Sequence, residues 1–194
     1  MARNTKKPLP GRLRIVAGKW RSRLLDIADV PGLRPTSERI RETLFNWLAP
    51  TIAGSRCLDL FAGTGALGLE AISRGAAGAV FVEKSHRAAE TLERNIDLVG
   101  AASTATVHRT DAFEFMAQNG QTPFDIVFLD PPFAADMLDD LCRLLDQGSL
   151  LAKGALIYIE EDNAKPTVEL PTGWQALRTR AAGNVRYSLL KAGA

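Results

Sequence analysis

The sequence predicts an α/β fold built on a largely parallel sheet. From residue 56 onward, short apolar segments alternate with segments of helical periodicity. Repeated β–α units of this kind form parallel sheets that are covered by helices on both faces. Residues 174–191 have the pattern of strands, interrupted only by a turn sequence at 182–184. This predicts two antiparallel strands at one edge of the sheet. The length of 194 residues suits one domain, with room for a small extension.

The N-terminal segment has the alternation of a β-hairpin. Within residues 11–27, Leu13 and Ile15 fall on one strand face, and basic residues fall on the other. Gly18-Lys19 can form the turn, and the residues that follow can return as a second strand. We therefore expect a hairpin with a basic outer face.

A helix is expected directly after this extension. Thr36 or Ser37 can cap it, apolar residues follow at helical spacing, and Pro50 ends it. We place the boundary here, with a basic arm and hairpin over residues 1–35 and a main domain over residues 36–194. In the main domain, the expected strands before the terminal pair span 56–61, 78–84, 105–110, 124–130 and 154–161, and the expected helices span 65–75, 85–100, 111–120 and 135–148.

Charge is unevenly distributed along the chain, although the formal net charge is only +2. Eight basic residues and no acid precede Asp26, and four basic residues and no acid follow Glu169. Such segregation indicates a surface that contacts a polyanion. The basic residues of the expected hairpin are Arg12, Arg14, Lys19, Arg21 and Arg23.

Composition excludes several classes of protein. No apolar run approaches the roughly 18 residues that span a bilayer, and no apolar segment follows the basic N-terminus as in a secretory signal. Cys57 and Cys142 lie far apart, so we expect reduced thiols in a cytoplasmic protein. No Cys/His cluster has metal-ligand spacing. We expect a monomer that uses neither a metal nor a membrane.

Acidic residues follow four successive predicted strands. They are Asp59, Glu83, Asp111 and Asp130. In open α/β sheets, ligands bind beyond the carboxyl ends of the strands, so these acids are expected to share one site. Asp111 alone is equally well explained as the cap of a helix or as an acceptor for an adenine amino group.

The segment DLFAGTGALG contains glycines at the spacing Gly63-x-Gly65-x-x-Gly68. Such a loop lets the backbone approach a ligand and presents the start of a helix. Glu83 lies about 20 residues further on, where a carboxylate can hold two ribose hydroxyls. These features fit an adenosine-containing cofactor, so NAD and S-adenosylmethionine both remain open, and a tight β–α turn would also explain the glycines alone.

The segment Asp130-Pro131-Pro132-Phe133 is more specific. Its two prolines fix two φ angles and remove two donors, so the turn offers carbonyl oxygens and one carboxylate to an N–H group. Phe133 gives a flat face for a base, and such stacking is worth about 1–3 kcal/mol. Two acceptors that grip an aromatic amine favour a more pyramidal nitrogen, whose lone pair can attack a methyl group. The segment therefore favours methyl transfer from S-adenosylmethionine to a base.

In this order, the motifs resemble S-adenosylmethionine-dependent methyltransferases with the Rossmann-like seven-stranded fold. The segments RIVAGKWRSRLL, PGLRPTSERIRETLFNWLAP, CLDLFAGTGALGLEA, DIVFLDPPF and ALIYIEE are together similar to the bacterial RsmD family. That family methylates the exocyclic N2 amine of a guanine in 16S ribosomal RNA of the small subunit. The resemblance runs from about residue 11 to residue 190.

The resemblance implies a role for each group of residues. The acceptor amine would be gripped by Asp130 and the Pro131 carbonyl and stacked on Phe133, and Arg34 and Thr36 would close over the site. The cofactor would be held by Asp59, Phe61, Gly63, Gly65, Glu83, Asp111 and Ala112. The partner would be 16S ribosomal RNA within a small-subunit assembly particle. The residues that would bind this RNA are Arg12, Arg14, Lys19, Arg21, Arg23 and Arg34.

Three alternative functions are open at this point. An adenine-N6 DNA methyltransferase would use the same chemistry at Asp130, but the chain is too short for a separate DNA-recognition domain. An NAD-dependent oxidoreductase would leave the two prolines unexplained. An RNA-binding protein without activity would have no need of acids at four strand ends.

Overall fold

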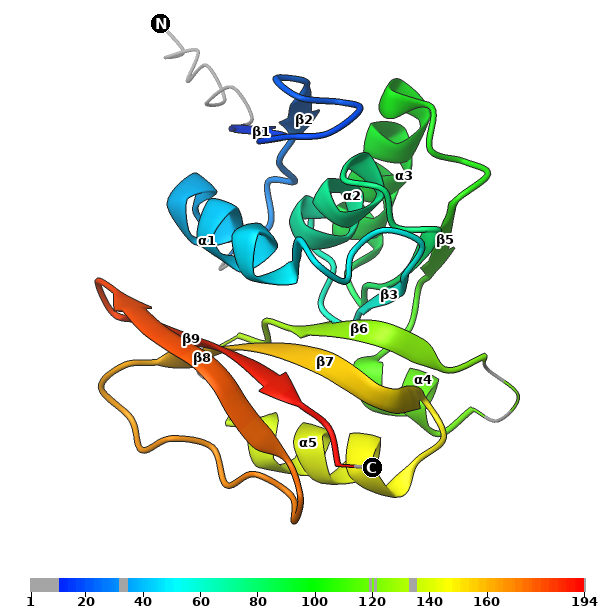
Figure 1. Ribbon diagram of the computed structural model, residues 1–194. Helices are drawn as coiled ribbons and strands as arrows, with labels where there is room; N and C mark the ends of the chain where they lie inside the picture. Colours follow the sequence, from blue (N-terminus) through cyan, green and yellow to red (C-terminus); the bar gives the residue numbers. More distant parts are fainter. Residues whose placement is uncertain (1–10, 32–34, 119, 121, 133–135, 194) are drawn as a thin grey trace, which may run out of the picture.

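The computed structural model describes residues 11–31, 35–118, 120, 122–132 and 136–193. Its central sheet has seven strands in the order β5-β4-β3-β6-β7-β9-β8, in which the first five are parallel and β9 is antiparallel to both of its neighbours, β7 and β8 (Figure 1). These strands are β3 Arg56–Asp59, β4 Gly78–Val82, β5 Ala105–His108, β6 Phe124–Leu129, β7 Leu151–Asp162, β8 Gln175–Ala182 and β9 Val185–Lys191. The helices are α1 Glu38–Leu48, α2 Ala66–Ser73, α3 His86–Val99, α4 Ala112–Met116 and α5 Leu138–Gln147.

Helices cover both faces of the sheet, as the sequence predicts. In Figure 1, α1, α2 and α3 lie above the sheet, and α4 and α5 lie below it. The strands supply alternate residues to the two layers. Phe128 packs with the upper helices, whereas Val127 and Leu129 pack with the lower ones. No helix in the described ranges is long and apolar enough to cross a membrane.

The helix ends follow the caps that the sequence predicts. The Ser37 hydroxyl accepts a hydrogen bond from the Ile40 amide at the start of α1. Ser85 caps α3 in the same way, and Gly100 ends this helix with φ of +70°, a conformation that favours glycine. α4 ends at Met116 and is therefore shorter than the predicted helix over 111–120.

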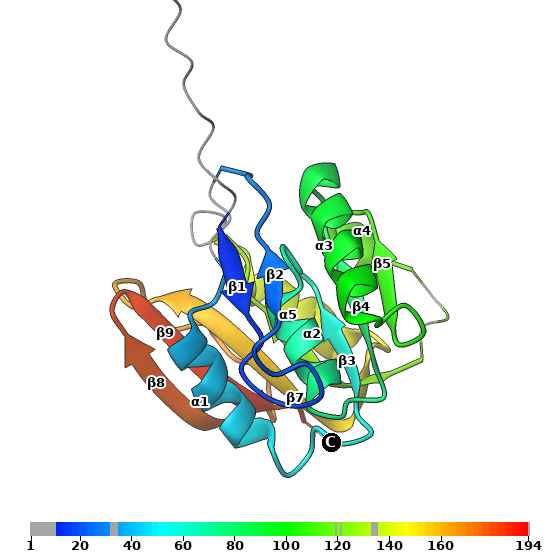
Figure 2. The ribbon, with the colours of Figure 1, turned by 90° about the horizontal axis from the view of Figure 1, so that it is seen from above.

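The N-terminal hairpin is present, but its predicted tight turn is wrong. β1 Arg12–Arg14 pairs with β2 Leu24–Asp26, and residues 15–23 form a loop between them. This loop leaves the ladder to bind the end of α2 (Figure 2). The Ser73 carbonyl accepts a hydrogen bond from the Lys19 amide at 2.7 Å, and the Ser73 hydroxyl accepts one from the Trp20 amide at 3.0 Å. Tertiary contacts therefore override the turn.

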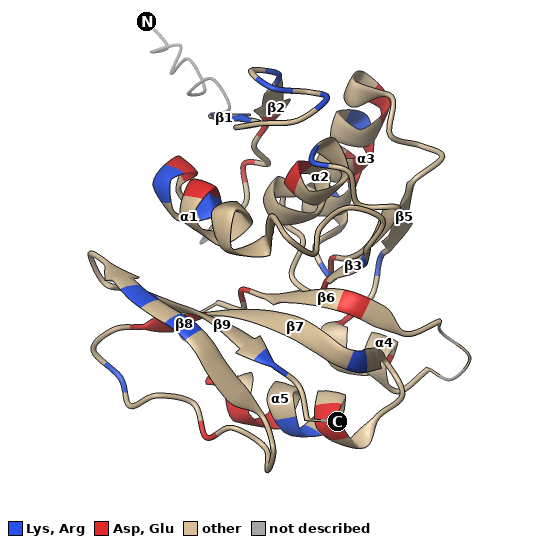
Figure 3. Cartoon of the chain, in the orientation of Figure 1, with Lys and Arg blue, Asp and Glu red and all other residues tan. Residues whose placement is uncertain are grey.

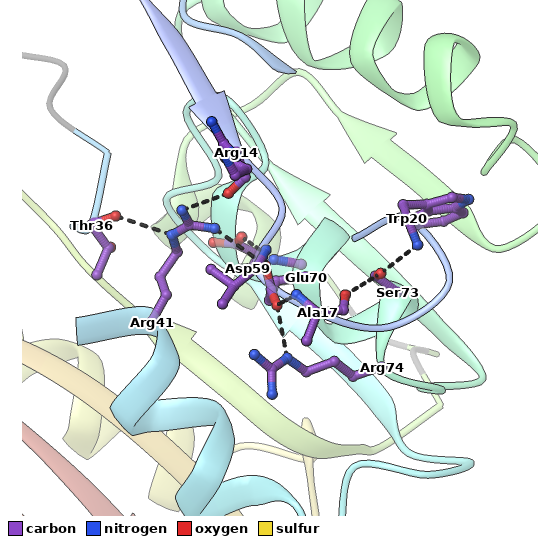
Figure 4. Close-up of polar contacts among 11 residues, drawn as sticks. Arg14, Ala17, Trp20, Thr36, Arg41, Asp59, Glu70, Ser73 and Arg74 are labelled. Atoms are coloured by element: carbon purple, nitrogen blue, oxygen red, sulfur yellow. Dashed lines mark hydrogen bonds and ion pairs between the residues drawn. The ribbon is translucent and has the colours of Figure 1, made fainter. Parts of the chain in front are cut away.

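A buried carboxylate fixes this loop to the main domain. Glu70 of α2 is fully buried, and its oxygens accept hydrogen bonds from the amides of Val16 at 2.8 Å and Ala17 at 3.0 Å (Figure 4). Glu70 also forms ion pairs with Arg41 at 3.2 Å and Arg74 at 2.7 Å. Together these donors compensate the cost of burying the charge.

Arg41 extends this contact to two further segments. Its guanidinium donates one hydrogen bond to the Arg14 carbonyl at 2.8 Å and another to the Thr36 carbonyl at 3.2 Å. Arg41 is itself 1% exposed, so these bonds form away from water. The hairpin, the start of α1 and α2 are thus joined at one guanidinium.

Asn95 of α3 joins the hairpin to the glycine-rich loop. Its side chain accepts a hydrogen bond from the Asp26 amide at 2.9 Å and donates to the Asp26 carbonyl at 3.0 Å. It also donates to the Thr64 carbonyl at 3.1 Å. The second strand of the hairpin therefore has a fixed position relative to residues 63–65.

The burial of Glu70 predicts a large effect of its removal. We expect Glu70→Ala to lower the free energy of unfolding by about 3–5 kcal/mol, because Arg41 would remain buried without its carboxylate. As a control, Arg87→Ala removes an exposed ion pair with Asp29 and should cost less than about 1 kcal/mol. Urea denaturation measures both changes. Equal, small losses in the two variants would contradict a structural role for Glu70.

Candidate active site

The acids predicted from the four strand ends lie at one edge of the sheet. Asp59 is the last residue of β3, and its neighbours across the ladder are Phe81 of β4 and Phe128 of β6. Glu83 follows β4 directly, and Asp130 follows β6 directly. Because the strands are parallel and in register, their carboxyl ends open on the same side.

Glu83 holds the glycine-rich loop in place. Its carboxylate accepts hydrogen bonds from the Gly63 amide at 2.8 Å and from the Ser85 amide at 2.7 Å. The loop then turns through Gly65, whose φ of +81° favours glycine. A Cβ at Gly65 would also lie 2.4 Å from a methyl carbon of Leu92. The loop is therefore a preformed backbone cradle at the start of α2.

Asp59 lies beneath this cradle. It is 2% exposed, and its carboxylate accepts a hydrogen bond from the Gly68 amide at 3.1 Å. Burial raises the pKa of Asp59 to about 7, and the charge of Glu83 adds to this effect, despite the hydrogen bond from Gly68. Phe61 is half-buried beside it. A carboxyl held without a basic partner is suited to a ligand that brings positive charge or N–H donors.

Asp111 serves as a helix cap. Its carboxylate accepts a hydrogen bond from the Phe113 amide at 2.9 Å and forms an ion pair with Lys84 at 3.0 Å. The hydrogen bond from Lys84 is the main cause of its lowered pKa. The neighbouring Ala112 is buried. Contact of Asp111 and Ala112 with an adenine ring stays a prediction.

Asp130 is fixed by the N-terminal part of the chain. The Thr36 hydroxyl donates a hydrogen bond to its carboxylate at 3.1 Å. Burial raises the pKa of Asp130 well above its ordinary value, and the nearby charge of Glu160 raises it further. Pro131 is buried and Pro132 is exposed. The predicted stacking residue Phe133 lies outside the described residues, as does Arg34.

Sequence reasoning missed Glu160 and Tyr158 of β7. The Tyr158 hydroxyl donates a hydrogen bond to the Glu160 carboxylate at 2.7 Å, and both residues are buried. Burial also raises the pKa of Glu160. The signal was available, because Glu160 follows the apolar run 155–159 just as Asp130 follows 126–129. The rule that finds acids at strand ends applies to this fifth strand as well.

A cavity of about 240 Å³ opens beside the proline turn on the side of α5. Pro131, Pro132, Leu138 and Val168 contribute to its wall. Its volume lies below the roughly 300–1,000 Å³ of sites for drug-sized ligands, so it suits a smaller group. The residues that line it include five acids, which disfavour a phosphate, together with Lys165; the acids are Asp136, Asp139, Glu160, Glu161 and Asp162.

The basic residues predicted on the hairpin are all exposed. Leu13, Ile15, Trp20 and Leu25 are buried, so the hairpin presents its charged side to solvent. Figure 3 shows basic positions along the hairpin and the loop that joins its strands. The exposed basic residues are Arg12, Arg14, Lys19, Arg21 and Arg23. Arg12 also lies 3.6 Å from Asp26 in a half-exposed ion pair. The predicted alternation of the hairpin is thus confirmed, and its role in RNA binding stays a prediction.

The raised pKa of Asp59 predicts a pH-dependent stability. In the folded protein this carboxyl keeps its proton up to about pH 7, whereas an unfolded aspartate loses it near pH ~3.9. The folded state therefore binds more protons between these values, and this contribution to stability falls as the pH rises through that window. Asn at this position still accepts the Gly68 hydrogen bond.

Urea unfolding of the wild type and Asp59→Asn between about pH 4 and 8 measures this linkage. The stability of the variant relative to the wild type should increase as the pH rises to about 7 and then level off. A difference that does not change with pH would contradict the raised pKa.

Comparison with known proteins places this chain in a family. The family described as Conserved hypothetical protein 95 matches residues 13–191. The ribosomal RNA small subunit methyltransferase D of Escherichia coli is 48% identical, with 92% of this chain and 89% of that protein covered. The Haemophilus influenzae protein of the same name is 42% identical, over 92% of this chain and 93% of its own.

Solved structures agree with this assignment. A structure from Escherichia coli described as a methyltransferase superposes with a TM-score of 0.87 at 43% identity, covering 95% of this chain and 99% of that one. An RNA methyltransferase from Salinibacter ruber, solved with S-adenosyl-L-homocysteine, shares the fold at 17% identity, with a TM-score of 0.63 over 82% of this chain and 94% of that one. The chain therefore belongs to the RsmD family of small-subunit ribosomal RNA methyltransferases and is an S-adenosylmethionine-dependent methyltransferase.

Proposed function

We propose that this protein methylates the exocyclic N2 amine of a guanine in 16S ribosomal RNA of the small subunit. The observation that carries the proposal is the proline turn at the end of β6, where Asp130 is held by Thr36 next to the glycine-rich cradle. The relatives that share 42–48% identity are named for small-subunit ribosomal RNA. A donor-free turn with one carboxylate is the arrangement that an amine with two N–H groups requires.

The residues beneath and beside the cradle fit the cofactor. Asp59, Gly63 and Gly65 would hold the methionine end, where the raised pKa of Asp59 marks a carboxyl that lacks a cationic partner. Glu83 would bind the ribose hydroxyls. Phe61, Asp111 and Ala112 would complete the cofactor-binding side, with the last two at the adenine. When bound, S-adenosylmethionine supplies an electrophilic methyl group.

The acceptor side works by positioning and electrostatics. Asp130 and the Pro131 carbonyl would each accept one N–H of the amine, which directs the nitrogen lone pair away from the ring. Phe133 would stack on the base. A guanine amine inside a duplex lies in the minor groove, so the base must be unpaired or extruded to reach this turn.

The exposed hairpin would hold the RNA backbone. Residues 1–35 would serve as the RNA-contacting extension and residues 36–194 as the catalytic domain. Phosphate contacts from Arg12, Arg14, Lys19, Arg21, Arg23 and Arg34 would position the RNA, while the pocket selects the base. We further propose that the substrate is a small-subunit assembly particle in the cytoplasm and that the protein acts as a monomer.

A direct assay tests this function. Methyl-labelled S-adenosylmethionine is incubated with small subunits from cells that lack the protein, with naked 16S RNA and with DNA. Mass mapping of the labelled nucleotides should give N2-methylguanine in the small-subunit RNA. Label in adenine of DNA would instead support an adenine-N6 methyltransferase. If no substrate accepted label, the enzymatic proposal would fail.

Two variants separate the acceptor from the cofactor. Asp130→Ala should lower the rate of methyl transfer by about 10²–10⁴-fold or more. The affinity for S-adenosylmethionine, measured by calorimetry, should be largely kept. Glu83→Ala should lose cofactor affinity first, because it frees the Gly63 amide as well as the proposed ribose contact. Loss of cofactor binding in Asp130→Ala would contradict the role given to that residue.

Charge reversal tests the hairpin. Arg14→Glu and Arg21→Glu change exposed side chains, and the hydrogen bond from Arg41 to residue 14 is kept because it uses the backbone carbonyl. RNA affinity should fall, and the slope of log affinity against log salt should decrease by about one for each phosphate that is no longer bound. Arg143→Glu on α5, beneath the sheet, is the matched control. An unchanged slope in the hairpin variants would remove the hairpin from the interface.

A further inference from the structure

Two carboxylates meet at the ends of adjacent strands. Leu129 of β6 pairs with Ile159 of β7 in parallel register, so the next residues, Asp130 and Glu160, are neighbours. Both side chains lie on the face of the sheet that carries α1, because each is two residues beyond a residue packed in that layer. Those two residues are Phe128 and Tyr158, whose ring centroids are 6.4 Å apart.

The two carboxylates share one donor. The Thr36 hydroxyl donates to Asp130 at 3.1 Å, and it also lies close enough to Glu160 to favour the ionised form of that carboxyl. A hydroxyl has only one proton to donate, so it cannot satisfy both carboxylates when both are ionised. Thr36 and Glu160 are 6% and 4% exposed, which limits compensation by water. The pair therefore favours holding one proton between its two members.

The hydrogen bond from Tyr158 determines which of the two carboxylates holds the shared proton. Its hydroxyl donates to Glu160 at 2.7 Å, which stabilises the ionised form of that residue. The last proton that the pair loses as the pH rises is therefore the one on Asp130, the member that faces the acceptor site, and both members are ionised above that pKa. The other titratable groups near the pair are Asp59 of β3, whose charge also acts on Asp130, and Tyr187 of β9, which acts on Tyr158.

We propose that Glu160 is a positioning residue that, with Tyr158, makes Asp130 the acceptor of the proton released by the guanine amine. This inference rests on the proposed function and adds a proton path to it. Without Glu160, the positive charge of the cofactor would favour the ionised form of Asp130 and make it a weaker base. The adjacent ionised Glu160 favours protonation of Asp130 and so increases its basicity.

Methyl transfer along this path conserves atoms and charge. The amine nitrogen forms a bond to the methyl carbon, and the bond from that carbon to the sulfonium sulfur breaks, with its electron pair remaining on sulfur. The nitrogen gives up one proton to the Asp130 carboxylate and keeps the electron pair of the broken N–H bond. The products are the neutral N2-methyl base, S-adenosylhomocysteine and protonated Asp130, which releases its proton to solvent after the products leave.

The acid side of the pH–rate profile tests this role. Activity requires Asp130 to be ionised, so single-turnover methyl transfer falls as the pH drops through its pKa. In Glu160→Gln the repelling charge is gone, so the acid limb should move to lower pH by about one pH unit or more, and the plateau rate should fall roughly tenfold. Tyr158→Phe should also move the limb to lower pH, because the first proton then settles on Glu160.

Glu161→Gln is the matched control. Glu161 is the next residue of β7 and is also buried, but it pairs with Arg186 at 3.1 Å rather than with Asp130. Its variant should keep the wild-type acid limb, whatever it does to stability. Calorimetric titration of S-adenosylmethionine should give the same affinity in all three variants, within about threefold of the wild type.

A second readout does not depend on turnover. Carbon-13 NMR of labelled aspartate carboxyls gives the titration of Asp130 in the free protein, with Asp130→Asn used for its assignment. Its midpoint should fall in Glu160→Gln and stay unchanged in Glu161→Gln. A limb and a midpoint that do not move in Glu160→Gln would overturn the inference and leave the proposed function standing. A shifted midpoint in a protein that methylates no RNA would instead refute the function.

Discussion

The buried carboxylate of Glu70 is the interaction on which the rest of the structure depends. It accepts hydrogen bonds from two amides of the N-terminal loop and forms ion pairs with Arg41 and Arg74. A buried charge is tolerated only when several donors surround it, and these donors come from three separate segments. Arg41 in turn binds the Thr36 carbonyl, and the Thr36 hydroxyl binds Asp130. One chain of contacts therefore leads from a structural ion pair to the acid at the proposed acceptor site.

The edge of the sheet is electrostatically divided. Asp111 has Lys84 as a partner, and its pKa is lowered. Asp59 and Glu160 are buried and Asp130 is half-buried among acids and neutral donors, and the pKa of each is raised. Acids held in this way cost stability unless a ligand supplies the missing donors. A cationic cofactor beside Asp59 and an amine beside Asp130 would each supply them.

Sequence patterns predicted the types and order of the elements because hydrophobic periodicity and caps are local properties. They did not predict the loop at 15–23, since that loop follows contacts with Ser73 and Glu70, more than fifty positions away. Four candidate site acids were predicted from strand ends alone. Glu160 also follows an apolar run, but its position beside Asp130 depends on the pairing of β6 with β7, which periodicity leaves open. The burial of Arg41 likewise required its distant partner to be known.

The fixed hairpin gives the basic surface a geometric role besides attraction. Asn95 binds both Asp26 of the hairpin and Thr64 of the glycine-rich loop, so the two cannot move independently without breaking hydrogen bonds. Phosphate contacts position a nucleic acid, and base contacts select the target. If RNA binds this hairpin, its backbone is therefore held at a fixed distance from the cofactor cradle. A flexible basic arm would give the same attraction but not this alignment, and methyl transfer requires alignment within about an ångström.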